Sequence, residues 1–295
     1  MNIAIIGSKG LGKELGKRGT TSDITLYNLT FQGKNYTFIE PEKYPEKIQT
    51  MFQAINMSNF VILFVSKDIE KKILGECILA IDILKLNGII VLDGFEENEL
   101  KNIISNTNLK NFPIMEKSFH EIIKHLESFN VEIVSDEPKV LVDHAFQVKS
   151  VGTVILGTVI SGEIKKYDVM KIFPQNKEVM IKSIQINDKD FENAKCFDRV
   201  GLALKGIEVD EIQRGDIIGK NIECINEINV KIEKNIFYKG DAPTNVMCLV
   251  GLQYINSKMF ENKISFDKKI AFNKEKVIIL TPDKPMRIFG IAISE

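Results

Sequence analysis

The first stretch of this sequence that could do chemistry is a glycine-rich loop near the N-terminus. Residues 7–13 match the pattern G-x-x-x-x-G-K and directly follow the apolar run 2–6. In such a loop the glycines let backbone N–H groups wrap an anion, and the lysine reaches a phosphate oxygen. The alternative is a strand-to-helix turn that binds no ligand. The pattern predicts a phosphate-binding loop formed by Gly7, Lys9, Gly10, Gly12 and Lys13.

The residue after this loop departs from the pattern. A serine or threonine is expected there, because its hydroxyl ligates the Mg²⁺ that accompanies the phosphates. The sequence has Glu14 instead. A carboxylate beside phosphates costs on the order of 1 to 4 kcal/mol at a separation of a few ångströms. Glu14 could also hold a metal directly or pair with Lys17, but repulsion is the simplest interpretation, and it indicates a vestigial phosphate loop.

The elements that must position this loop follow an alternating pattern over roughly the first 130 residues. Short apolar runs alternate with helix-period segments, as expected for a mostly parallel sheet covered by helices. The predicted strands are 2–6, 23–29, 35–40, 59–65, 88–92 and 111–115, and the predicted helices are 45–57, 68–86, 96–106 and 116–129. We expect 23–29 and 35–40 to form a hairpin at the sheet edge, and Asp68 to cap the second of these helices.

The pattern changes at residues 135–138, where short strands with turn signals replace the helices. The strands 141–148, 151–161, 168–173, 177–185, 199–205 and 216–219 are typical of a closed β-barrel. A second β-rich unit runs from about residue 222 to the end. The predicted domains are therefore 1–135, 136–220 and 221–295.

Composition narrows the functional classes. The net charge of -1 provides no general field for attracting nucleic acid or an anionic membrane, so any RNA contact must be local. The four cysteines (Cys77, Cys196, Cys224 and Cys248) are scattered without metal-ligand spacing, and we expect reduced core residues. No apolar run is long enough to span a bilayer. We expect a cytoplasmic protein with no metal site and neither a DNA nor a membrane partner.

The barrel segment carries a resemblance to a known family. Its motifs are V-D-H-A-F at 142–146, V-G-T-V-x-x-G-x-V-x-S-G at 151–162, R-V-G-L-A-L-K-G at 199–206 and R-G-D at 214–216. They closely resemble the second domain of translational GTPases of the elongation factor Tu and 1-alpha type, including the selenocysteine-specific elongation factor. Residues 237–240 and 250–253 resemble the third domain of that branch. The resemblance implies an α/β P-loop GTPase-like domain followed by two β-barrel domains. It also implies transfer RNA or the ribosome as partner, because the second domain meets the aminoacyl end of transfer RNA.

The GTPase motifs of this family are altered in the sequence. The D-x-P-G-H motif falls at 39–43, where only Pro41 remains. The guanine-reading N-K-x-D falls at 93–96, where Asp93 and Glu96 stand at its ends, and Glu96 could still accept from a base. The S-A-[KL] signal at 115–117 is unrecognisable. The resemblance thus implies a degenerate GTPase domain without catalytic residues.

Three hypotheses follow. The first is a translation-factor-like protein that binds transfer RNA, the ribosome or another translation component without hydrolysing GTP and without a resident cofactor. The second is a functional GTP- or GDP-binding elongation factor that uses an atypical loop containing Lys9, Lys13 and Glu14. The third is a regulatory module whose first domain binds a protein.

Overall fold

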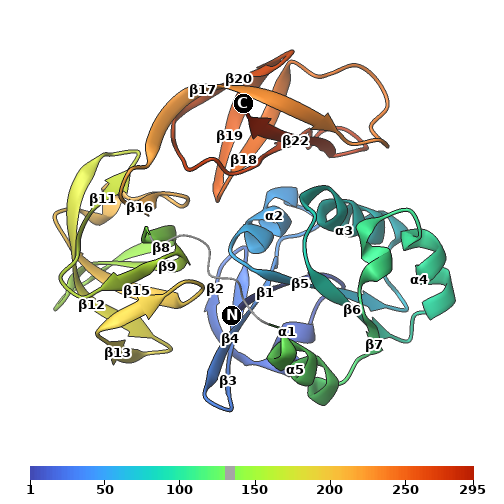
Figure 1. Ribbon diagram of the computed structural model, residues 1–295, viewed down its shortest axis with the longest axis horizontal. Coiled ribbons are helices and arrows are strands. Elements are labelled where there is room, and N and C mark those ends of the chain that lie inside the picture. The colour runs from blue at the N-terminus through green and yellow to red at the C-terminus, as the bar shows by residue number, and fades with distance from the viewer. Residues whose placement is uncertain (130–136) are drawn as a thin grey trace. The chain divides into compact units, whose positions relative to one another are not determined.

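The computed structural model describes residues 1–129 and 137–295, and their contacts divide the chain into two compact units, Met1–Glu132 and Ile133–Glu295 (Figure 1). The change of pattern predicted at 135–138, with the domain boundary between 135 and 136, lies largely outside the described residues. The second unit contains two barrels. An α/β domain followed by two six-stranded barrels is the fold class predicted from the sequence, and it is confirmed.

The N-terminal unit is built on a seven-stranded sheet with the order β2-β3-β4-β1-β5-β6-β7. Strand β1 pairs in parallel with β4 and β5, and the parallel pairing continues to β6 and β7. The central strands are buried on both faces, which explains their unbroken apolar runs. The strands are β1 (Asn2–Gly7), β2 (Lys17–Thr21), β3 (Thr25–Phe31), β4 (Lys34–Glu40), β5 (Phe60–Ser66), β6 (Gly88–Asp93) and β7 (Ile114–Glu116).

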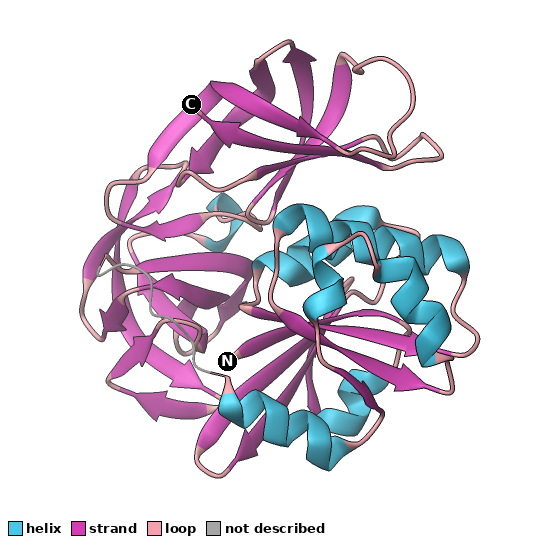
Figure 2. Ribbon diagram, turned by 45° about the vertical axis from the view of Figure 1, so that its right-hand side comes forward, coloured by secondary structure: helices cyan, strands magenta, loops and turns pink. Residues whose placement is uncertain are grey.

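Helices cover both faces of this sheet (Figure 2). Leucines of α1 and apolar residues of α5 pack with β1 and β5 in one core cluster, while α2 and α3 contact β1 from the other side. The helices are α1 (Leu11–Leu15), α2 (Ile48–Asn56), α3 (Lys71–Leu84), α4 (Glu97–Ile104) and α5 (Phe119–Ser128), with a 3₁₀ turn at Asn108–Asn111.

Two local predictions are wrong. The predicted hairpin of β3 and β4 exists, with Gln32 and Gly33 at positive φ in its two-residue turn, but it is not at the edge of the sheet. Strand β2 pairs with β3 and forms the edge instead. Helix α3 begins at Lys71 after Glu70, so Asp68 does not cap it; Asp68 lies in the turn between β5 and this helix.

The first barrel closes because β11 pairs with both β12 and β16. The ring β11-β16-β8-β9-β15-β12 encloses a core of valine, isoleucine and leucine side chains. Its strands are β8 (Lys139–Val148), β9 (Gly152–Ser161), β11 (Val169–Phe173), β12 (Lys177–Ile186), β15 (Arg199–Lys205) and β16 (Ile217–Gly219), with short strands β10 (Glu163–Lys165), β13 (Lys189–Phe191) and β14 (Asn193–Lys195).

The second barrel is a closed ring of six antiparallel strands in the order β17-β20-β19-β18-β21-β22. Inward residues alternate along these strands, as on β19, and they form a single apolar core. The strands are β17 (Glu223–Lys234), β18 (Asn245–Val250), β19 (Gln253–Phe260), β20 (Lys263–Phe272), β21 (Val277–Leu280) and β22 (Ile288–Ser294).

Within residues 1–129 and 137–295, no helix has the length and apolar character needed to cross a membrane. All four cysteines are free. Cys77 and Cys248 are buried, as expected, whereas Cys196 and Cys224 are only partly buried.

Candidate functional site

The glycine-rich loop lies between β1 and α1 and is bonded to the end of β5. Gly7 has a φ of +103°, and a Cβ at this position would lie 2.3 Å from the carbonyl oxygen of Phe64, so only glycine fits. The N–H of Ser8 donates to that same carbonyl at 2.8 Å, and its hydroxyl lies 2.9 Å from the Ser66 hydroxyl. Gly10 also has a positive φ, of 99°. The loop is thus placed at the carboxyl end of the sheet, where α/β folds bind ligands.

A carboxylate from the protein itself contacts the centre of this loop. Glu40, the last residue of β4, accepts a 2.7 Å hydrogen bond at Oε1 from the N–H of Gly12. The N–H of Gly10 also favours the ionised form of this carboxylate. Burial raises the pKa of Glu40, while these two N–H groups and the charge of Lys13 oppose the rise. The donors that would hold a phosphate therefore hold Glu40.

The charged residues predicted for this site do not converge on one point. The ammonium group of Lys9 donates to the backbone carbonyl of Glu42 at 2.8 Å. Lys13 folds back so that its Nζ lies 3.8 Å from the point where Gly10 would carry a Cβ. The partner of Glu14 is Lys117 rather than Lys17, at 3.5 Å between Nζ and Oε1.

Lys117 also reaches the predicted guanine-reading position. Its Nζ lies 2.8 Å from Oδ2 of Asp93, at the end of β6. The hydrogen bond that Lys117 donates to Asp93 is the main reason that the pKa of Lys117 is raised, with Glu14 contributing. The structure therefore brings Asp93 and Glu14 together through a shared lysine. Glu96 is exposed just before α4 and does not join this group.

Three residues of this site were missed from the sequence. Glu40 and Lys117 are described above, and Tyr27 on β3 is the third. A Cβ on Gly12 would lie 2.5 Å from the ring of Tyr27, so this ring packs directly on the loop. Glu40 and Lys117 both fall within altered family motifs, at 39–43 and 115–117, whereas Tyr27 had no sequence signal.

A second polar cluster lies in the first barrel, where Arg199 on β15 pairs with Asp143 on β8. Two parallel hydrogen bonds of 2.8 Å join the guanidinium and the carboxylate. Burial opposes ionisation of Asp143, but Arg199 and His144 outweigh it and lower the pKa of Asp143. Nδ1 of His144 lies 3.2 Å from Oδ2 of Asp143, and the ring of Phe146 is 41 % exposed on the same strand.

A polar hollow of about 450 Å³ lies between the two barrels of the second unit. Asp216 borders it and accepts from the N–H of Gln213 at 2.8 Å and from the Gln175 amide at 2.6 Å. Burial raises the pKa of Asp216 to about 6. Across the hollow, Lys268 of the second barrel donates to the Gln213 side chain at 3.0 Å. This hydrogen bond links the barrels directly.

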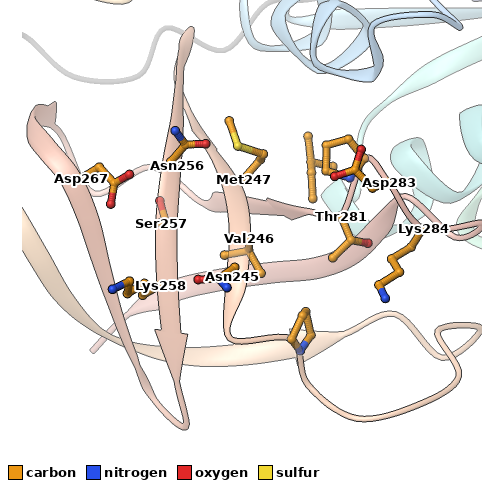
Figure 3. A pocket seen from close by; sticks show the side chains of 13 residues that line it. Asn245, Val246, Met247, Asn256, Ser257, Lys258, Asp267, Thr281, Asp283 and Lys284 are labelled. Atoms are coloured by element: carbon orange, nitrogen blue, oxygen red, sulfur yellow. The ribbon is translucent and has the colours of Figure 1, made fainter.

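A further hollow, of about 370 Å³, lies on the second barrel (Figure 3). The labelled side chains around it include two lysines, Lys258 and Lys284, and two aspartates, Asp267 and Asp283. Because their charges offset one another, this hollow offers no net positive field for a phosphate backbone.

Comparisons with known proteins agree with this architecture. A family model described as elongation factor Tu domain 2 matches residues 152–219. The chain is 38% identical over 304 residues to the uncharacterised protein MJ0325 of Methanocaldococcus jannaschii, covering 99% of this chain and 98% of that protein. It is 30% identical over 295 residues to the selenocysteine-specific elongation factor of the same organism, which covers 90% of this chain and 62% of that factor.

A solved structure of an elongation factor has a similar fold. Translation elongation factor SelB from Methanococcus maripaludis, in complex with the GTP analogue GppNHp, matches with a TM-score of 0.87 and 25% identity. The match covers 100% of this chain and 78% of that chain. The chain therefore belongs to the same family as protein MJ0325, contains a segment that matches elongation factor Tu domain 2, and is homologous to the selenocysteine-specific elongation factor.

Proposed function

We propose that this protein binds a component of the translation machinery, transfer RNA or the ribosome, and does so without a cycle of GTP binding and hydrolysis. The domain-2 match and the similarity to the selenocysteine-specific elongation factor support the translational role. The selenocysteine-specific factor of Methanocaldococcus jannaschii is matched over only 62% of its length, so its complete activity does not transfer to this chain. Because translation takes place in the cytoplasm, the proposed role includes a cytoplasmic location.

The observation that carries the loss of the GTP cycle is the position of Lys117 between Glu14 and Asp93. Glu14 stands where the family has the hydroxyl that ligates Mg²⁺, and Asp93 stands where it begins to read guanine. Both carboxylates already share a partner in the protein. A nucleotide would have to displace Lys117 and bring its phosphates beside an acidic side chain, without the metal ligand that neutralises them.

The first barrel offers a surface for the partner. The Asp143–Arg199 pair links β8 to β15 across the intervening β9, and Phe146 presents a 41 % exposed ring further along β8. An exposed aromatic ring on a rigid strand can stack on a base or pack on an aminoacyl group. The family resemblance assigns the aminoacyl end of transfer RNA to this domain, which agrees with such a surface.

Titration calorimetry with GTP and GDP, with and without Mg²⁺, tests the first half of the proposal. We expect no binding heat for either nucleotide. Micromolar, guanine-selective and Mg²⁺-dependent binding would instead establish the second hypothesis, a functional GTP-binding factor.

Retention of aminoacylated transfer RNA or of ribosomes at moderate salt tests the second half. We expect retention by the wild-type chain and a loss of about fivefold or more in Phe146→Ala, given the usual energy of aromatic stacking. Phe191→Ala is the matched control, because Phe191 is 39 % exposed on the same barrel. Equal losses in both variants would contradict the assigned surface, and no retention by the wild type would contradict the translational role.

A further inference from the structure

Glu40 occupies an unusual position for a charged side chain. Only 5 % of it is exposed, and it lies at the end of a strand in the middle of the sheet. Its carboxylate accepts a hydrogen bond from the N–H of Gly12 at 2.7 Å, and the N–H of Gly10 also favours its ionised form. A buried carboxylate is retained only where donors and positive charge offset its lost hydration.

The donors that hold Glu40 are those that the loop pattern offers to a phosphate. In a G-x-x-x-x-G-K loop the backbone N–H groups point into the loop and bind oxyanions. A carboxylate is also an oxyanion, and it accepts from the same groups. Glu40 and a phosphate group therefore compete for Gly10 and Gly12.

The residues around Glu40 are also those expected around a bound phosphate. Lys13, the lysine of the loop pattern, contributes a favourable charge to Glu40. The ring of Tyr27 packs over Gly12, and the Glu40 carboxyl carbon lies 3.1 Å from the point where Gly12 would carry a Cβ. The Glu40 carboxylate and the Tyr27 ring thus both lie against the loop at Gly12.

We propose that Glu40 is an internal ligand of the phosphate loop, a side chain that replaces the nucleotide phosphate and holds the loop in its anion-bound conformation. This inference deepens the proposed function, because it gives a physical reason why the domain remains folded without nucleotide. The loop then keeps one state, because its ligand is tethered to the chain and is always present to bind again. Changes at the loop cannot signal nucleotide binding or release.

Thermal unfolding with pyrophosphate as the probe tests this inference, with sodium chloride at matched ionic strength as the reference. We expect no saturable stabilisation of the wild type. Glu40→Ala leaves the buried N–H of Gly12 without its acceptor, so its Tm should fall by roughly 5 °C or more and recover saturably with millimolar pyrophosphate. Glu42→Ala, which removes a neighbouring carboxylate, is the control and should gain no pyrophosphate dependence.

A second measurement covers the case in which Glu40→Ala does not fold. In the wild type, the amide resonances of Gly10 and Gly12 should titrate together with one carboxyl group, and Glu40→Gln should abolish that titration. Equal stabilisation of the wild type and Glu40→Ala by pyrophosphate would overturn the inference. So would a titration of the Gly10 and Gly12 resonances that is the same in Glu40→Gln as in the wild type. Retention of transfer RNA by the wild type is measured separately, so the role of Glu40 and the translational role can each be refuted without the other.

Discussion

The N–H of Gly12 and the carboxylate of Glu40 meet at 2.7 Å although 28 residues separate them in the sequence. The ring of Tyr27 also packs on Gly12, at 2.5 Å from a hypothetical Cβ. An N–H group whose glycine is enclosed by two side chains cannot gain a methyl group without displacing one of them.

Gly12→Ala should therefore destabilise the protein by about 1 to 3 kcal/mol through overpacking. The free energy of unfolding in urea measures this. Gly75→Ala is the control, because Gly75 lies within α3 with no atom inside 4 Å of its hypothetical Cβ. That control should be stabilised by roughly 0.5 to 1 kcal/mol, since alanine favours a helix. Similar effects in both variants would contradict the packing described here.

The Asp143–Arg199 pair should dominate the stability of the first barrel. The Arg199 side chain is only 10% exposed, so Asp143→Ala would leave a nearly buried guanidinium without its partner. We expect a loss of about 3 to 5 kcal/mol in the free energy of unfolding. Asp190→Ala, which removes an exposed carboxylate that accepts from Gln185, should cost less than about 1 kcal/mol. Equal costs would contradict the assigned role of the pair.

Asp216, which borders the hollow between the two barrels, should make the free energy of unfolding depend on pH. Its pKa is about 6 in the folded protein against an ordinary value of 3.8, so the folded state binds this proton more tightly. The resulting stabilisation is complete below about pH 4 and is lost as the pH rises through about 6, on the order of 3 kcal/mol. Asp216→Asn should remove this dependence. The difference in unfolding free energy between wild type and variant, followed with pH, measures it; a constant difference would refute the prediction.

Gly215 of the first barrel lies close to Gln253 of the second barrel, so a side chain at position 215 should destabilise the protein. Gly215 has a φ of +95°, and its hypothetical Cβ would lie 2.5 Å from Cγ of Gln253. Gly240 has a similar φ of +99° but open space around it. Gly240→Ala should cost about 1 kcal/mol from backbone strain alone, and Gly215→Ala about 1 to 3 kcal/mol more from the clash. Equal losses of unfolding free energy would show that the clash is relieved without cost.

Most of the fold could be predicted because buried strands and amphipathic helices leave strong local patterns. Strand β2 could not, because four of its five residues are exposed and its pattern shows no apolar alternation. The Asp68 cap was wrong because a turn, with the N–H of Ile69 bonded to the carbonyl of Ser66, delays the start of α3. Residues 7–13 follow a local sequence motif, which is why a phosphate-type loop could be predicted there.

The occupancy of the site could not be predicted in the same way. Glu40 reaches Gly12 from a neighbouring strand, and Lys117 reaches Glu14 across 103 residues of sequence. Such pairs depend on strand order and side-chain direction, which no local pattern encodes. The predicted repulsion at Glu14 therefore omitted the lysine that pairs with it.

The affinity for aminoacylated transfer RNA, measured with GTP, with GDP and without nucleotide, tests the central claim most directly. A factor that cycles GTP changes its affinity for its partner between the two nucleotide states, whereas a protein with an internal ligand in its phosphate loop cannot. We expect the three dissociation constants to agree within about twofold. A difference of about tenfold or more between GTP and GDP would contradict the account.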